Sequence, residues 1–357
     1  MDWIGDKTLI IAELSANHNN DLERAKATIH AMAAAGADAV KVQTYKPESL
    51  CMDIDNAYFG KRPAGLWKGR TLWDLYKEGS LPYEWHAELQ QVAKDAGLLF
   101  FSSPFDLDAV DFLEQLAVPF YKIASFEINH IPLIDKVART GKPVIISTGV
   151  ADEADIQLAL ATCYQAGNRQ VALLKCTSQY PAQIADANLK TIPAMLQRFS
   201  VPVGVSDHTA GALVPGVAVS LGARIVEKHF TLNRADGGPD SAFSMEPDEF
   251  KQMVEQVRQV EASLGQVSYQ ISHADKMRRR SIFFAKNLAA GEIIQPEDIR
   301  VLRNGSGLHP RYLNLLYKQE LQQDAVAGEP TTTSHFDQSL RLTDSTVSPS
   351  NQNEPNH

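Results

Sequence analysis

The sequence predicts an α/β fold, a TIM (β/α)8 barrel followed by a second, smaller domain. Eight short apolar runs, each closed by polar residues, alternate along the first two thirds of the chain with segments of helical apolar spacing. Strand alternating with helix eight times is the pattern of this barrel. The runs are almost continuously hydrophobic, which is typical of parallel strands covered on both faces.

The expected strands are, in chain order, 9–18, 39–44, 99–104, 120–127, 144–149, 171–180, 203–208 and 225–230. Residues 22–37 are typical of the segments between them, because apolar residues recur there at helical spacing. Several of these segments close on a glycine before the next strand, as at Gly36, Gly97 and Gly141, and glycine is a common helix terminator. Each such segment is therefore predicted to be a helix that covers the barrel.

Composition limits the classes of protein to consider. The chain has 357 residues, 44% of them hydrophobic, which suffices for one large core and a small second domain. A net charge of −9 argues against a nucleic-acid partner, and no apolar stretch is long enough to span a membrane. The start MDWIGDK lacks the segments of a signal peptide, and the three cysteines form neither an even set nor a CxxC pair. We therefore expect a cytoplasmic protein.

Two histidines occupy matching positions at the ends of neighbouring runs. His208 closes VGVSDH, and His229 is the last polar residue of IVEKHF. Parallel strands of a barrel all end at one face, so the two rings would share one divalent ion if their strands are neighbours. Neutral imidazoles suit Mn, Fe, Co or Zn. The alternative is that each histidine is a hydrogen-bonded core residue.

Lysines and serines also gather at the strand ends. Lys41 and Lys122 lie within apolar runs, where a charge is costly unless paired, so we expect both to face a polar cavity. Lys175 has a similar position, and the serines at the same rim are Ser102, Ser103, Ser125, Ser147, Ser178 and Ser206. Such a set suits a phosphate or carboxylate. The alternatives are that the lysines extend outward, or pair with Glu13, Glu127 or Glu227.

The chain resembles the sialic acid synthase family over about residues 8–335, through eight short motifs in fixed order. They are AELSANH, KVQT, FSSPF, YKIASFE, IISTG, KCTSQYP, SDHT and EKHFT. This family condenses phosphoenolpyruvate with an amino-sugar aldehyde to give nine-carbon 2-keto acids. Residues 65–86 and 234–244 resemble its pseudaminic acid branch, with the N-acetylneuraminate and legionaminic acid synthases as alternatives.

The resemblance implies a role for each strand-end residue. It implies that His208 and His229 hold a divalent metal ion, Mn²⁺ or alternatively Mg²⁺ or Co²⁺. The residues that would surround phosphoenolpyruvate are Lys41, Lys122, Ser103, Ser125, Ser147, Ser178 and Ser206. Those that would face the sugar are Gln43, Glu127, Tyr180 and Asp240. Glu13 would lie near the reacting carbons, and we expect Glu13, Glu127 and the two lysines to be catalytic. Ser178 stands where N-acetylneuraminate synthases often carry Asn.

The second domain follows the predicted barrel of residues 1–264. Residues 265–280 are polar and end in a basic run, which indicates a linker. Residues 281–336 resemble the small, mostly β antifreeze-like (SAF, β-clip) domain of the family, which packs over the partner's active site. The resemblance thus implies a domain-swapped homodimer in which Arg303 reaches the neighbour's sugar, although Asn304 replaces the family's usual Pro. Residues 337–357 are poor in apolar residues and are predicted to be disordered.

Two other classes of function compete with a metal-dependent synthase. A Schiff-base aldolase would use Lys122 or Lys175 as a covalent nucleophile on the same barrel. A non-catalytic protein would bind a partner or carbohydrate through residues 281–336 and use the barrel as a scaffold. The intact set of strand-end residues favours the synthase.

Overall fold

The computed structural model describes residues 3–340, and its first part is a closed barrel of eight parallel strands in sequential order. The strands are β1 (Leu9–Glu13), β2 (Ala39–Thr44), β3 (Leu99–Pro104), β4 (Tyr121–Ile123), β5 (Val144–Ser147), β6 (Val171–Cys176), β7 (Val203–Asp207) and β8 (Ile225–His229). Pairing of β1 with β8 closes the barrel. The predicted TIM barrel is therefore confirmed.

Six strands end earlier than predicted, β5, β7 and β8 by one or two residues and β1, β4 and β6 by four or five. In the last three the chain turns at the barrel rim while its residues remain apolar or small. After β1 the backbone adopts a left-handed conformation at Ser15, with φ 48°. After β4 it forms a 3₁₀ turn at Ser125–Glu127, and after β6 it enters a loop that contains a cis Tyr180–Pro181 bond. Residues expected to close strands thus lie on loops at the carboxyl ends of the strands.

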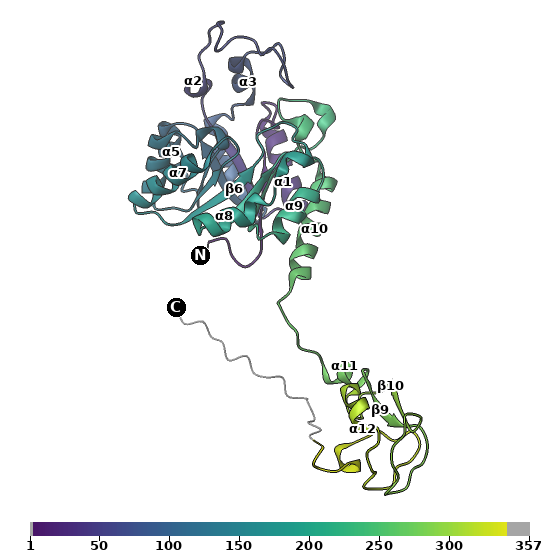
Figure 1. Ribbon diagram of the computed structural model, residues 1–357. Coiled ribbons are helices and arrows are strands. Elements are labelled where there is room, and N and C mark those ends of the chain that lie inside the picture. Colours follow the sequence, from purple (N-terminus) through teal and green to yellow (C-terminus); the bar gives the residue numbers. More distant parts are fainter. Residues whose placement is uncertain (1–2, 341–357) are drawn as a thin grey trace. The chain divides into compact units, whose positions relative to one another are not determined.

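Helices follow the strands and form the outer layer, as Figure 1 shows for α5, α7, α8, α9 and α10. The main helices are α1 (Leu22–Ala34), α4 (His86–Asp95), α5 (Leu107–Gln115), α6 (Ile131–Arg139), α7 (Glu153–Gln165), α8 (Thr191–Phe199), α9 (Leu213–Ser220) and α10 (Pro247–Leu264). Gly36, Gly97 and Gly141 follow helices at φ 88°, 79° and 73°, a conformation that favours glycine.

Side chains that point into the barrel form two layers of opposite character. Alternate residues of a strand face the same side, so Ile11 and Glu13 both point inward from β1. Towards the amino ends of the strands the inward positions are apolar; they include Leu9, Ile11, Ala39, Phe101, Ile145, Ala172, Leu174 and Ile225. Nearer the carboxyl ends of the strands, the inward positions are polar and buried. They include Glu13, Lys41, Ser103, Lys122, Ser147, Ser206 and Glu227. The sequence therefore builds a polar chamber on an apolar floor.

A long segment between β2 and β3 covers part of the carboxyl end of the barrel. It contains α2 (Pro47–Leu50), α3 (Leu72–Gly79) and a 3₁₀ turn at Tyr83–Trp85. Figure 1 shows α2 and α3 beyond one end of the barrel. Since the segment leaves from the end of β2, this is the end at which the polar chamber opens.

A second compact unit begins at Gln266. It contains α11 (His273–Met277), two antiparallel strands, β9 (Arg280–Phe284) and β10 (Ile299–Arg303), a 3₁₀ turn at Pro310–Tyr312, α12 (Leu313–Leu316) and a last turn at Thr333–His335. The segment predicted to be a linker, 265–280, thus includes a short helix. Of the predicted tail, residues 341–357 lie outside the described residues. None of the described helices is long and apolar enough to cross a membrane.

Candidate active site

Four buried charged side chains meet inside the barrel, one each from β1, β2, β4 and β8. The Lys122 Nζ donates to both carboxylate oxygens of Glu227, at 2.7 and 2.8 Å. The Lys41 Nζ lies 3.1 Å from Glu13 Oε2 and 3.2 Å from Glu227 Oε1. Both lysines therefore lie inside the barrel, and the pairing with glutamates that we considered as an alternative is also present.

These contacts shift the protonation of each group. Burial alone would raise the pKa of Glu227, but the two lysines hold it below its usual range. Burial would lower the pKa of Lys41, and the charges of Glu13 and Glu227 raise it instead. For Lys122 burial prevails and lowers the pKa to about 8. Burial likewise raises the pKa of Glu13 to about 7. Glu13 and Lys122 thus both have pKa values close to neutral pH.

Serine hydroxyls line the same chamber. The Oγ atoms of Ser103 and Ser147 are buried and have no hydrogen-bond partner among the described residues. Ser206 Oγ donates to Glu227 Oε1 at 3.1 Å, and Ser125 Oγ accepts the Gly149 N–H at 3.1 Å. An unpaired buried hydroxyl is costly unless a ligand satisfies it. Together with two lysines, these donors suit a small anion.

Gly149 allows two of the serines to approach each other. A Cβ at this position would overlap Ser178 Oγ and lie 2.8 Å from Ser125 Oγ. Any side chain larger than hydrogen would displace both hydroxyls. The glycine of the motif IISTG is therefore required by close packing at the mouth of the chamber.

The two predicted metal ligands lie side by side, His208 directly after β7 and His229 at the end of β8. The rings of His208 and His229 lie 5.2 Å apart between centroids. His208 Nδ1 donates to the Thr177 carbonyl at 3.0 Å, which leaves Nε2 with a lone pair. Burial lowers the pKa of His229 well below its usual value, and its buried Nδ1 has no hydrogen-bond partner in the described chain. His229 Nδ1 is thus available to an ion, and His208 Nε2 would be the second imidazole ligand.

Other ligands would have to come from water or substrate. Within residues 3–340, no group of three or more His, Cys, Asp or Glu side chains is arranged to hold a metal ion. Burial alone would lower the pKa of His208, but the neighbouring Cys176 thiol raises it through a hydrogen bond and its charge. A pair of imidazoles with open positions fits a metal that binds substrate directly.

Of the side chains expected to face the sugar, Tyr180 lies beside the histidine pair, and Gln43 and Asp240 are linked through Ser15. The Tyr180 ring lies 4.4 Å from that of His208. Gln43 Nε2 donates to Glu13 Oε1 at 3.1 Å and to Ser15 Oγ at 3.2 Å, and the Ser15 hydroxyl bonds to the Asp240 carboxylate. These contacts join the loops after β1, β2, β6 and β8 around one opening.

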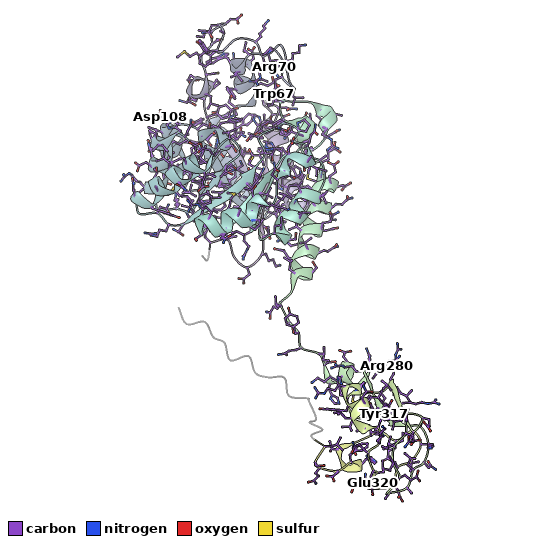
Figure 2. All side chains as sticks on the ribbon, in the orientation of Figure 1. Trp67, Arg70, Asp108, Arg280, Tyr317 and Glu320 are labelled. Atoms are coloured by element: carbon purple, nitrogen blue, oxygen red, sulfur yellow. The ribbon has the colours of Figure 1, made fainter. Side chains whose placement is uncertain are left out.

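Trp67 extends this wall from the segment between β2 and β3. Its indole N–H donates to the Pro239 carbonyl at 2.9 Å, and its ring lies 6.0 Å from that of Tyr180. Figure 2 shows Trp67 at the carboxyl end of the barrel. The contact joins the two segments, 65–86 and 234–244, on which the resemblance to the pseudaminic acid branch depends.

Lys175 lies outside this cluster, and Arg303 belongs to the second unit. Lys175 Nζ donates to the Cys176 carbonyl at 3.2 Å and to Thr177 Oγ1 at 2.9 Å, so it is directed away from the two buried lysines. Arg303 ends β10 in the second unit and is exposed.

Sequence reasoning gave Glu227 only as a possible partner of the lysines and did not single out Ser15 or Trp67. A glutamate within an apolar strand was the one available signal for Glu227.

Similarity to known proteins agrees with this site. The profile of the NeuB family matches residues 28–269, and that of the SAF domain matches residues 279–337. The chain is 42% identical to a pseudaminic acid synthase of Helicobacter pylori, over 93% of this chain and 98% of that protein. It is 41% identical to a pseudaminic acid synthase of Campylobacter jejuni, over 92% and 97%.

A solved structure of similar fold is the N-acetylneuraminic acid synthetase of Leptospira borgpetersenii. It superposes with a TM-score of 0.68 at 31% identity and covers 76% of this chain and 90% of that one. The NeuB match, residues 28–269, includes the two buried lysines, Glu227 and the paired histidines. The chain therefore belongs to the NeuB family and carries a SAF domain.

Proposed function

We propose that this protein is a pseudaminic acid synthase. It condenses phosphoenolpyruvate with 2,4-diacetamido-2,4,6-trideoxy-L-altrose and water, and releases pseudaminic acid and phosphate. The observation that carries the proposal is the similarity to two pseudaminic acid synthases over almost their whole length. The polar chamber supports it, because it offers an anion site next to a pair of imidazoles.

Lys41 and Lys122 would hold the anionic phosphoenolpyruvate at the floor of the chamber. Their ammonium groups are the buried cations there, and Ser103 and Ser147 offer hydroxyls that lack other partners. Ser125, Ser178 and Ser206 would complete the set. Fixing phosphoenolpyruvate in this way directs C3 of the enol towards the opening, where the sugar enters. Positioning of two reactants can supply on the order of 7 kcal/mol of the reduction in barrier.

The sugar would lie above, between Gln43, Glu127, Tyr180 and Asp240. His208 and His229 would hold a divalent ion, for which we propose Mn²⁺, and such an ion supplies Lewis-acid polarisation of an aldehyde oxygen. C3 of phosphoenolpyruvate forms the new bond to the aldehyde carbon, which leaves a cationic centre at C2. Water adds at C2, and the hemiketal phosphate breaks its C–O bond to release phosphate.

Glu13 would act on the cationic stage of this sequence. It lies 3.1 Å from Lys41 and has a pKa raised to about 7 by burial, so near neutral pH it interconverts between acid and carboxylate. As a carboxylate it stabilises positive charge at C2 and accepts a proton from the incoming water. Burial also raises the pKa of Glu127 to about 7, and this carboxyl would bind the sugar.

The second unit would complete the site in a homodimer. The described part of this unit holds its own apolar core, including Ile282, Phe284 and Leu316, so it can pack as a body. We propose that it covers the partner's barrel opening and that Arg303 contacts the partner's sugar. The three cysteines are unpaired, which fits a cytoplasmic location.

The test is phosphate release from phosphoenolpyruvate after chelation and Mn²⁺ readdition, with three sugars in parallel. The expected result is metal-dependent release with the diacetamido altrose sugar alone. Release with N-acetylmannosamine would place the enzyme among the N-acetylneuraminate synthases, and release with the legionaminic acid precursor in that branch. Inactivation by borohydride in the presence of substrate, with indifference to chelation, would instead indicate a Schiff-base aldolase.

A further inference from the structure

A cavity of about 390 Å³ opens at the carboxyl ends of β2, β3 and β4, beside the chamber. Its lining includes Leu50, Phe105, Phe126, Glu127, Asn129 and His130. The volume is within the range of small-molecule sites. Of these residues only Glu127 has a place in the proposed reaction, so the rest of the lining has no assigned purpose.

Phe126 is the most unusual residue of this lining. It is 60% exposed, although a phenyl ring gains most from burial. It lies in the 3₁₀ turn directly after β4, between Ser125 and Glu127. Phe105, at the end of β3, contributes a second ring and is held in place by Tyr45 at 5.2 Å between centroids. Two aromatic rings thus give one side of the cavity an apolar wall.

The other side of the cavity is polar. Glu127 Oε2 is buried and has no hydrogen-bond partner among the described residues. His130 Nδ1 accepts the Leu133 N–H at 3.4 Å, so the neutral ring carries its proton on Nε2. Asn129 offers an amide. The lining therefore combines an acceptor for an N–H, donors for a carbonyl and an apolar surface, and these are the requirements of an acylamino group.

The cavity also lies close to the reacting groups. Burial raises the pKa of Glu127, and the charges of Lys122 and Lys41 act on the same carboxyl in the opposite sense. Ser125, next to Phe126, is part of the expected phosphoenolpyruvate site and bonds to Gly149. An open-chain sugar whose aldehyde carbon lies above the lysines would have a substituent of its carbon chain within reach of this cavity.

We propose that this cavity, the acyl pocket, binds one of the two acetamido groups of the sugar. The methyl group would pack against Phe126 and Phe105, the N–H would donate to Glu127, and the carbonyl would accept from Asn129 or His130. The inference rests on the proposed function and adds to it a subsite that recognises the acyl substituent on one nitrogen of the sugar. It makes Phe126 a specificity-determining residue.

The test uses Phe126→Ala, which enlarges the pocket, and Phe126→Trp, which fills it. Leu158→Ala is the matched control, because Leu158 is also about half exposed, at 51%, but lies on the outer helix α7. Each enzyme is assayed with the diacetamido sugar and with two analogues that carry a butanoyl group in place of the acetyl group on either nitrogen. Binding of the same sugars is measured by calorimetry.

We expect Phe126→Ala to raise kcat/KM about tenfold for one butanoyl analogue and not the other, because two added methylenes fit the enlarged pocket. With the natural sugar it should raise KM about fivefold, and Phe126→Trp should weaken binding further. Equal changes for both analogues, or none, would overturn the acyl pocket. If Phe126→Ala favours binding of one analogue over the other but the enzyme does not turn over the diacetamido sugar, only the proposed function is overturned, and the acyl pocket stands.

Discussion

Replacing Glu227 by Gln tests the central feature of the chamber, the carboxylate shared by two buried lysines. Glu227 accepts from Lys122 at 2.7 and 2.8 Å and lies 3.2 Å from Lys41. Glutamine keeps the size of the side chain but removes the charge and turns an N–H group towards an ammonium. Glu13 would then be the carboxylate that remains in contact with Lys41, at 3.1 Å.

The expected effects follow from burial. Removing one member of a buried ion pair costs about 3 to 5 kcal/mol of stability, because the remaining charge is left without compensation. The pKa of Lys122, already lowered to about 8, should fall further. Much of Lys122 would then be neutral at about pH 7.5. The enzyme would lose one charged hydrogen bond to phosphoenolpyruvate, which contributes about 1.5 to 3 kcal/mol, so the KM for phosphoenolpyruvate should rise by about 10- to 100-fold.

The assay is phosphate release as a function of phosphoenolpyruvate concentration from about pH 6 to about pH 9, with urea unfolding in parallel. Asp207→Asn is the matched control: Asp207 forms a buried pair with Lys228 at 2.6 Å between β7 and β8, on positions that point away from the chamber. The control should lose stability and keep its KM. If Glu227→Gln matches the control in KM and pH profile, the shared carboxylate does not maintain the lysine charges.

Three further changes test other parts of the site. His229→Ala should abolish turnover and Mn²⁺ binding by calorimetry while circular dichroism stays unchanged; activity within a few fold of wild type would refute the metal assignment. Gly149→Ala should raise the KM for phosphoenolpyruvate about tenfold in the same phosphate assay, because the new methyl displaces Ser125 and Ser178. Since the folded pKa of Glu13 is raised from 4.5 to about 7, its contribution to stability is present below about pH 4.5 and lost by about pH 7. Urea unfolding should show this loss of roughly 3 kcal/mol, and Glu13→Gln should remove it.

Sequence alone predicted the barrel because parallel strands covered on both faces leave a strong hydrophobic pattern. It failed at the strand ends, where small and apolar residues continue into loops: β1 stops at Glu13, although AELSANH reads as a longer run. Periodicity cannot detect a left-handed residue such as Ser15, whose φ of 48° ends the extended conformation. The error affects only the ends of the strands, because closure of the barrel depends on pairing between their central residues.

The polar surroundings of Lys41 and Lys122 could be predicted from the sequence, because a lysine within an apolar strand is costly unless its charge is paired. Contacts between loops could not be predicted. Nothing in the sequence pairs Trp67 with Pro239, which is 172 residues away. Such a contact depends on the path of a long segment, whereas the chamber depends on the strand register alone.

The two layers of the barrel explain why the lysines need Glu227 before any substrate arrives. The apolar floor of Ile11, Phe101 and Ile225 removes water from below the ammonium groups, and burial there drives a lysine towards its neutral form. A neutral Lys122 would attract phosphoenolpyruvate weakly, so a permanent anion must keep it charged in the empty enzyme. Glu227 is suited to this task because the lysines hold its own pKa below the usual range, so it stays ionised wherever the enzyme is folded. When the substrate's anionic groups enter, they accept hydrogen bonds from lysines that are already protonated, and no proton has to be drawn from water.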